Sequence, residues 1–102
     1  MRPEQMTPTE RAALERLIEH AQRDSGQSRR VADFLLAWWN AGQCGGFDMT
    51  NLWAVDDAIA EDMGIVFRLV ARANSYPDTL GYGPQFEAIV REWRPELLDE
   101  SH

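Results

Sequence analysis

The segment that most constrains the fold runs from Leu52 to Ala73, because its apolar residues recur at the spacing of an α-helix. At 100° per residue, seven of its side chains fall on one face: Leu52, Val55, Ile59, Met63, Val66, Phe67 and Val70. Further apolar residues widen this face until only a thin polar strip is left opposite. One neighbouring helix could not cover such an arc. We therefore expect this segment to form the central helix of the protein.

A break near Asp56 is expected within this region. A helix running unbroken from the residue after Asp48 would place the Asp56 carboxylate on the apolar arc. With a break, a short helix follows Asp48, and Asp56 or Asp57 becomes the N-cap of the main helix. The acids then lie at the positive end of the helix dipole, and two arginines lie near its negative end.

The first helix is predicted from a capping box. Thr7 stands at the N-cap position, Pro8 at the first helical position, and Glu10 where its side chain can close the box. The apolar stripe that follows is narrow, so we expect this helix on the outside of the fold. Residues 1–6 precede it and are expected to be frayed.

Two more helices complete the prediction. Ser28 can cap a helix that runs to about Ala41, and its broad apolar surface places it in the middle of the fold. The last helix, Pro84 to Trp93, has a narrow stripe and stops before Pro95.

The loop before the last helix, NSYPDTLGYG, is rich in turn-forming residues but also aromatic. Flexible linkers are not aromatic, so we expect an ordered loop. Tyr76, Leu80 and Tyr82 should dock on the helices, with Pro77 and Gly81 setting the turn.

No segment alternates with a period of two, so the fold class is all-α: a compact bundle of four main helices plus one short helix. At 102 residues the chain has room for one domain, 1–102, whose residues 97–102 are expected to be frayed. No apolar run is long enough to span a membrane, and nothing resembles a secretory signal. A single cysteine cannot form an internal disulfide. We expect a cytoplasmic protein.

The charge distribution argues against direct nucleic-acid binding. The chain has no lysine, its ten arginines are scattered, and residues 31–64 contain six acids and no base. Phosphate backbones are bound by clustered basic side chains, which are missing here.

Two stretches carry a resemblance to a known family: FLLAWWNAGQCGGFDMTNLWAVDDAIAEDM and SYPDTLGYGPQFEAIVREWRPEL. They resemble a family of small uncharacterised proteins carried on integrative conjugative elements and plasmids of proteobacteria. The likeness covers about residues 28–98. It implies a genomic setting and no activity, cofactor or site.

Cys44 is the candidate reactive thiol. It lies in the glycine-rich turn GQCGG just ahead of a predicted helix start, where a helix N-terminus can lower the pKa of a thiol. Catalysis would also need a base, and His20 is connected to Cys44 by no local motif. The alternative is an inert loop or packed thiol.

The acids of the middle segment offer a second candidate site. Asp57 and Glu61 are neighbours at i,i+4 and could hold a divalent cation, but the spacing of an EF-hand loop is missing. The alternative is a solvated acidic face. Asp62 is expected to be half-buried and paired with an arginine such as Arg29 or Arg91.

Trp38 and Trp39 form the third candidate site. Adjacent helix positions point 100° apart, so one core contact cannot easily cover both indoles. One of them could face a partner, because tryptophan is enriched in interaction hot spots. The alternative is ordinary core packing.

The leading hypothesis is a non-enzymatic protein that acts through protein–protein association, as a homodimer formed by its two widest apolar helices. A second hypothesis is an acidic mimic of nucleic acid that occupies a basic protein. A third is a small enzyme, dependent on a metal held by Asp57, Glu61 and Asp62 or on the Cys44 thiol. No cofactor is expected.

Overall fold

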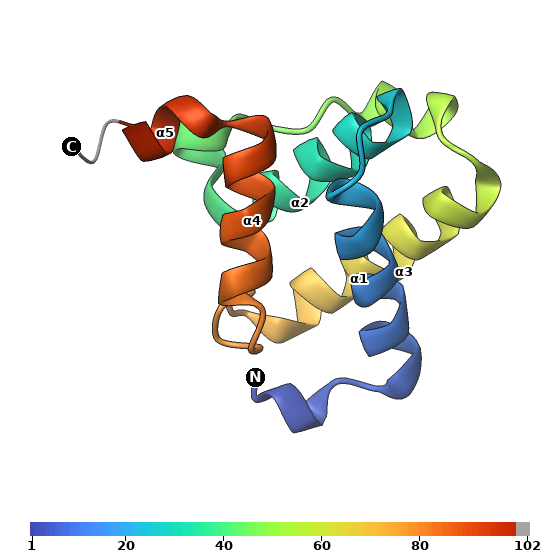
Figure 1. The fold of residues 1–102 in the computed structure, drawn as a ribbon. Coiled ribbons are helices and arrows are strands. Elements are labelled where there is room, and N and C mark those ends of the chain that lie inside the picture. The colour runs from blue at the N-terminus through green and yellow to red at the C-terminus, as the bar shows by residue number, and fades with distance from the viewer. Residues whose placement is uncertain (100–102) are drawn as a thin grey trace.

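The computed structural model describes residues 1–99, and the regular elements of this part are helices (Figure 1). In chain order they are the 3-10 helix η1 (Pro3–Gln5), α1 (Pro8–Ala21), α2 (Gly26–Cys44), the 3-10 helix η2 (Met49–Ala54), α3 (Asp57–Ala73), α4 (Gly83–Trp93) and α5 (Pro95–Asp99). The predicted all-α class with four main helices is confirmed. Of the expected fraying at the C-terminus, residues 100–102 lie outside the described part, whereas residues 97–99 belong to α5.

Local sequence signals set the start of α1 and of α3 as predicted. In the capping box of α1, Thr7 Oγ1 accepts a hydrogen bond from the Glu10 N–H at 3.1 Å, and Glu10 Oε1 accepts one from the Thr7 N–H at 2.9 Å. The break before α3 is also present, with Asp56 at the N-cap. Its backbone N–H donates to Gln27 Oε1 at 2.6 Å, which ties the start of α3 to the first turn of α2.

Both ends of α2 differ from the prediction. The N-cap is Ser25, whose hydroxyl accepts a hydrogen bond from the Ser28 N–H at 3.0 Å, so Ser28 lies inside the helix and is buried. At the other end the helix breaks at Asn40, which has an extended backbone. Asn40 Oδ1 then accepts a hydrogen bond from the Gln43 N–H at 3.2 Å, and the new turn continues to Cys44.

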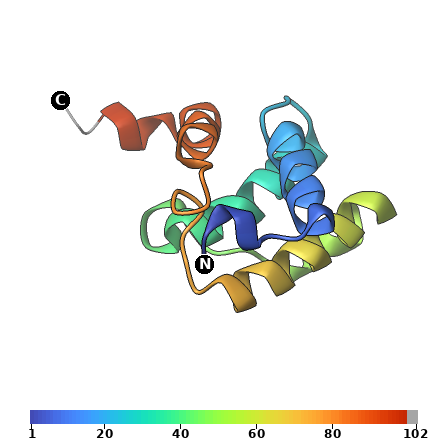
Figure 2. The same ribbon diagram turned by 90° about the horizontal axis from the view of Figure 1, so that it is seen from below.

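The arrangement of the helices corrects the sequence-based prediction, because α1 and not α3 occupies the middle. Helix α1 packs on α2, α3 and α4, and α2 packs on α1 and α4. Figure 2 shows α3 along one edge of the molecule. Helix α3 packs mainly on α1. The side chains of α1 that are buried in these contacts are Ala13, Leu14, Leu17, Ile18 and Ala21.

Small side chains explain why a helix with a narrow stripe can be central. Ala13 and Ala21 let neighbouring helices approach α1 closely, while Leu14 and Leu17 fill the space between them; all four are fully buried. A wide apolar arc therefore did not indicate a central position in this chain.

The ends of α2 and α4 are joined by polar contacts near the C-terminus. The indole N–H of Trp93 donates to the Ala21 carbonyl oxygen at 2.6 Å. The guanidinium of Arg94 donates to the Cys44 carbonyl oxygen at 3.0 Å and to Asp33 Oδ1 at 2.8 Å. These bonds hold the end of α4 against the end of α1 and against α2.

The N-terminal residues are packed against the helices, contrary to the fraying expected for residues 1–6. The N-terminal amino group donates to the Ala73 carbonyl oxygen at 3.3 Å and to Ser75 Oγ at 3.0 Å. Pro3–Gln5 form η1, and Met6 is only 6% exposed. The apolar side chain of Met6 gives this segment a reason to stay on the body.

The loop between α3 and α4 is ordered largely as predicted. Pro77, Leu80 and Tyr82 are buried, and Gly81 adopts a φ of 95°, which glycine accommodates without strain. Tyr76 is the exception, because 63% of its surface is exposed. Of the three side chains predicted to dock on the helices, Tyr76 is therefore the one that stays largely exposed.

The docking of Tyr82 has a titration signature. Burial, together with the hydrogen bond from its hydroxyl to Glu15 Oε2 at 2.7 Å, raises the pKa of Tyr82 to about 12. In a Tyr76→Phe variant, where Tyr82 is the remaining tyrosine, the phenolate absorbance of the folded protein should therefore appear near pH 12. The stabilisation is fully present below the unfolded pKa of about 10 and is lost as the pH rises through the folded value. Titration near pH 10 in the folded protein would contradict the docked loop.

Candidate functional site

An apolar groove lies between α2, η2 and α3. It consists of two adjoining hollows of about 280 and 210 Å³. Its lining residues are Phe34, Ala37, Trp38, Phe47, Met49, Leu52, Ala60, Met63, Gly64, Phe67, Arg68 and Val70. Arg68 is the one charged residue among them, so the apolar groove resembles a surface for another apolar surface more than a polar ligand site.

The wall of the apolar groove near η2 is fixed by an aromatic contact and a cap. The rings of Phe34 and Phe47 meet edge to face, with centroids 5.2 Å apart and planes at 76°. Asp48 caps η2 as predicted, since its Oδ1 accepts a hydrogen bond from the Thr50 N–H at 2.9 Å. Together these contacts position Met49, the first residue of η2, at the rim.

The rim of the apolar groove carries two large exposed side chains, Phe67 of α3 and Met49 of η2. Their exposed fractions are 61% and 59%. The periodicity of the sequence had placed Phe67 on the buried face. Exposed apolar side chains beside an apolar hollow are typical of an interaction surface. The excessive width of the apolar arc was the only signal in the sequence for this surface.

Both tryptophans of the α2 pair contact Phe86 of α4. The Trp39 indole stacks on the Phe86 ring, with centroids 5.6 Å apart and planes at 25°. The Trp38 indole meets the same ring at 87° and donates its N–H to the Ser75 carbonyl oxygen at 3.0 Å. One phenyl ring thus serves both indoles, which the sequence-based argument had not considered. Both remain half-buried, and a role in binding a partner stays a prediction.

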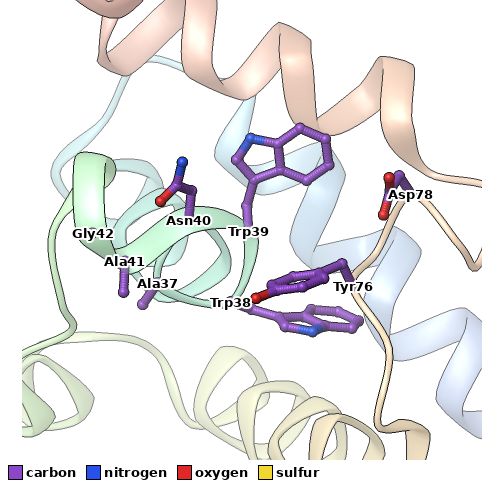
Figure 3. Close-up of a pocket in the computed structure, with 8 residues that line it drawn as sticks. All are labelled: Ala37, Trp38, Trp39, Asn40, Ala41, Gly42, Tyr76 and Asp78. Carbon is purple, nitrogen blue, oxygen red and sulfur yellow. The ribbon is translucent and has the colours of Figure 1, made fainter.

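A second, more polar hollow of about 620 Å³ lies beside this pair. Figure 3 shows Trp39 and Asn40 on one side of it and the Trp38 and Tyr76 rings side by side on another, with Asp78 across from them. It is wide and open, and its polar groups do not converge on one point (Figure 3). It is therefore a weaker candidate for a binding site than the apolar groove.

Asp62 is ion-paired, as expected, but it is buried and not half-buried, and its partner is Arg16 of α1. Both carboxylate oxygens accept hydrogen bonds from the guanidinium at 2.8 Å, in the bidentate geometry that arginine favours. The prediction of Arg29 or Arg91 as the partner was wrong, because it assumed that α3 lay in the middle of the fold. Since α3 rests on α1, the nearest arginine comes from α1.

Asp57 and Glu61 remain as an exposed acidic pair on α3. Within residues 1–99 neither carboxylate forms an ion pair. No group of three or more His, Cys, Asp or Glu side chains in the described part of the chain could hold a metal ion. Asp62, the third acid of the hypothetical cation site, is already held by Arg16.

Cys44 does not lie where a helix N-terminus could activate it. It is the last residue of α2, in the turn that follows the break at Asn40, and only 6% of its surface is exposed. Burial raises the pKa of the Cys44 thiol. The expected activation is thereby corrected, because burial favours the protonated and less reactive thiol.

Comparison with known proteins gives a family match and no characterised relative. The model of a family of unknown function, DUF7673, matches residues 11–94. No curated protein and no solved structure matches the chain significantly. The matched range includes the whole apolar groove. Separately, none of the helices in the described part is long and apolar enough to cross a bilayer.

The acids of α3 should differ in their effect on stability. Asp57→Asn combined with Glu61→Gln should change the free energy of unfolding by less than about 0.5 kcal/mol, because relief of repulsion offsets the lost dipole interaction. Asp62→Asn should lower it by about 1–3 kcal/mol, because a buried hydrogen-bonded charge is lost. Urea denaturation measures both. If the double variant lowered the free energy of unfolding as much as Asp62→Asn does, Asp57 and Glu61 would have to be paired with groups of the same chain.

The Cys44 thiol should react slowly. A thiol reagent at neutral pH should modify the native protein at least about tenfold more slowly than the unfolded protein, because modification requires local opening. A variant with Cys44→Ser and Gln85→Cys provides an exposed thiol on α4 as the matched control. Equal modification rates for the folded wild type and the folded control variant would contradict the buried position of Cys44.

Proposed function

We propose that this chain, which belongs to the family of unknown function DUF7673, is a non-enzymatic protein that acts through protein–protein association at its apolar groove. The observation that carries this proposal is the combination of an apolar hollow with the exposed Phe67 and Met49 side chains at its rim. The hollow and its rim are formed by α2, η2 and α3 together with Phe47.

The energetics favour a surface that is covered in use. Fully burying a phenylalanine or methionine side chain contributes about 1.5–3 kcal/mol. The folded chain forgoes part of this at Phe67 and Met49, which are 61% and 59% exposed. Scattered exposed apolar residues are ordinary, but Phe67 and Met49 adjoin one groove. Neither is needed to close the monomer core, which is centred on α1.

The partner favoured here is a second copy of the chain. Most soluble oligomers are symmetric homodimers, in which the same surface patch of both copies forms the interface. Such a patch must be complementary to itself. The apolar groove offers a hollow and a protruding aromatic side chain on the same surface, so one patch supplies both halves of such a contact. A cytoplasmic location, which is the expectation from the single cysteine, and an accessory role on a mobile element, which the sequence resemblance implies, are further parts of the proposal.

The runner-up is an acidic mimic that occupies a basic protein. The observation in its favour is that Asp57 and Glu61 are exposed and without an ion-pair partner among the described residues. Against it, Asp62 is held by Arg16, and Asp48 is engaged by Thr50 at the start of η2. Two carboxylates on one helix make a small surface for mimicry of a phosphate backbone.

An enzyme that acts at the apolar groove is disfavoured by the chemistry of the lining residues. The apolar groove contains no acid or base besides Arg68, and an arginine does not lose its proton at physiological pH. General acid–base catalysis needs a group that titrates near the working pH.

Sedimentation tests the association. At micromolar concentration we expect the wild-type chain to sediment with twice its 11.7 kDa mass and Phe67→Ser to sediment as the monomer. Trp53→Ser is the matched control, because this side chain is 85% exposed on η2 and does not line the apolar groove. A monomeric wild type would refute the dimer. Loss of association in Trp53→Ser alone would place the surface elsewhere.

A further inference from the structure

The exposed face of α3 carries a glycine that the monomer does not require. Gly64 lies in the middle of α3, where glycine disfavours a helix relative to alanine. A Cβ atom added there would meet no atom within 4 Å, and the helical backbone needs no positive φ at this position. Packing within the chain therefore gives no reason for glycine here. Glycine at an exposed helix position permits close approach of another backbone.

The same face is open to solvent along its length. Figure 2 shows α3 at one edge of the molecule, with α1 on its inner side and no helix beyond it. On a helical wheel, Gly64 stands at the centre of this outer face. By helical angle, Phe67 and Ala60 fall on the side of Gly64 next to the apolar groove, and Glu61 and Arg68 fall on the other side. Arg68 borders the apolar groove as well as the hollow beside Glu61.

The charged residues of this outer face repeat in reverse order about its centre. Going along α3, they are Asp57, Glu61, Arg68 and Arg72. In an antiparallel pair of α3 helices centred between residues 64 and 65, residue 61 of one copy stands level with residue 68 of the other, and residue 57 with residue 72. Each acid would then face a base.

The dipole of a single helix favours the same order of charges, so the order alone does not indicate a partner. The distinguishing feature is the register. The point about which acids and bases exchange coincides with Gly64, the position where two backbones can approach most closely. Among the described residues, Glu61 and Arg68 form no ion pair within the chain, whereas Arg72 pairs with Glu10.

We propose that two copies of this chain associate through antiparallel α3 helices that cross at Gly64, with Glu61 of each copy paired with Arg68 of the other. This inference rests on the proposed function and specifies its geometry. A two-fold axis between antiparallel helices keeps like sides together, so the apolar side of one α3 meets the apolar side of the other. Phe67 of each copy then stands level with the stretch between Ala60 and Gly64 of the other and enters the apolar groove there.

Charge exchange across the pair tests this geometry. In a symmetric dimer, Glu61→Arg places two arginines at each contact, and Arg68→Glu places two glutamates there. Each variant alone should dimerise at least about tenfold more weakly than the wild type at low salt. The doubly exchanged variant, Glu61→Arg with Arg68→Glu, should recover wild-type affinity, because every contact is again between opposite charges.

Mixing the two single variants gives the sharpest measurement. A mixed dimer has two contacts. At one, the arginine introduced at position 61 meets the glutamate introduced at position 68; at the other, native Arg68 meets native Glu61. Equimolar Glu61→Arg and Arg68→Glu chains, one carrying a mass label, should therefore form mixed dimers in preference to either homodimer. Native mass spectrometry counts the three species.

The outcomes separate this inference from the proposed function. Single variants that dimerise like the wild type, or that fail to combine when mixed, would overturn the antiparallel α3 geometry. If Phe67→Ser still abolishes association in that case, the apolar groove remains the binding surface and only the geometry is wrong. A wild-type chain that stays monomeric would overturn both. Thermal melts of every variant at low concentration confirm that the monomer is folded.

Discussion

The packing of α1 controls the rest of this structure. A single narrow apolar stripe contacts α2, α3 and α4, and small residues such as Ala13 and Ala21 make this possible. Because α3 rests mainly on α1, the outer flank of its wide apolar arc is left without a covering helix. The apolar groove and the exposed Phe67 follow from this arrangement. The candidate binding surface is thus a consequence of how the core is built.

Features governed by neighbouring residues could be predicted from the sequence. The capping box at Thr7, the cap of η2 at Asp48 and the break at Asp56 each depend on side chains within a few positions of the backbone that they stabilise. The ends of α4 were predicted for the same reason, with Pro95 following its last turn. The all-α class itself follows from the helical period of the apolar residues.

Features that depend on which helices meet could not be predicted. A wide apolar arc shows how much surface needs cover and not which helix supplies it, so α3 was placed centrally and Phe67 was assigned to the core. The arginine predicted to pair with Asp62 was wrong for the same reason, although an ion pair was expected. For Trp38 and Trp39, a single ring from α4 serves both indoles, and neighbouring residues in the sequence carry no sign of that contact.

The attachment of α3 mainly to α1 has a consequence for cooperativity. A helix with one principal neighbour can detach without separating the other helices from one another, so α3 can open as a unit while the packing of α1, α2 and α4 persists. Its polar tethers are the Arg16–Asp62 and Arg72–Glu10 ion pairs to α1, the bond from the amino terminus to the Ala73 carbonyl oxygen, and the Gln27 contact at its start. A ligand that binds only the closed form raises the opening free energy in proportion to the logarithm of its concentration. If a second copy is that ligand, amide hydrogen exchange in α3 would slow as the protein concentration rises. The exchange rate of this one helix would then measure the fraction of chains that are associated.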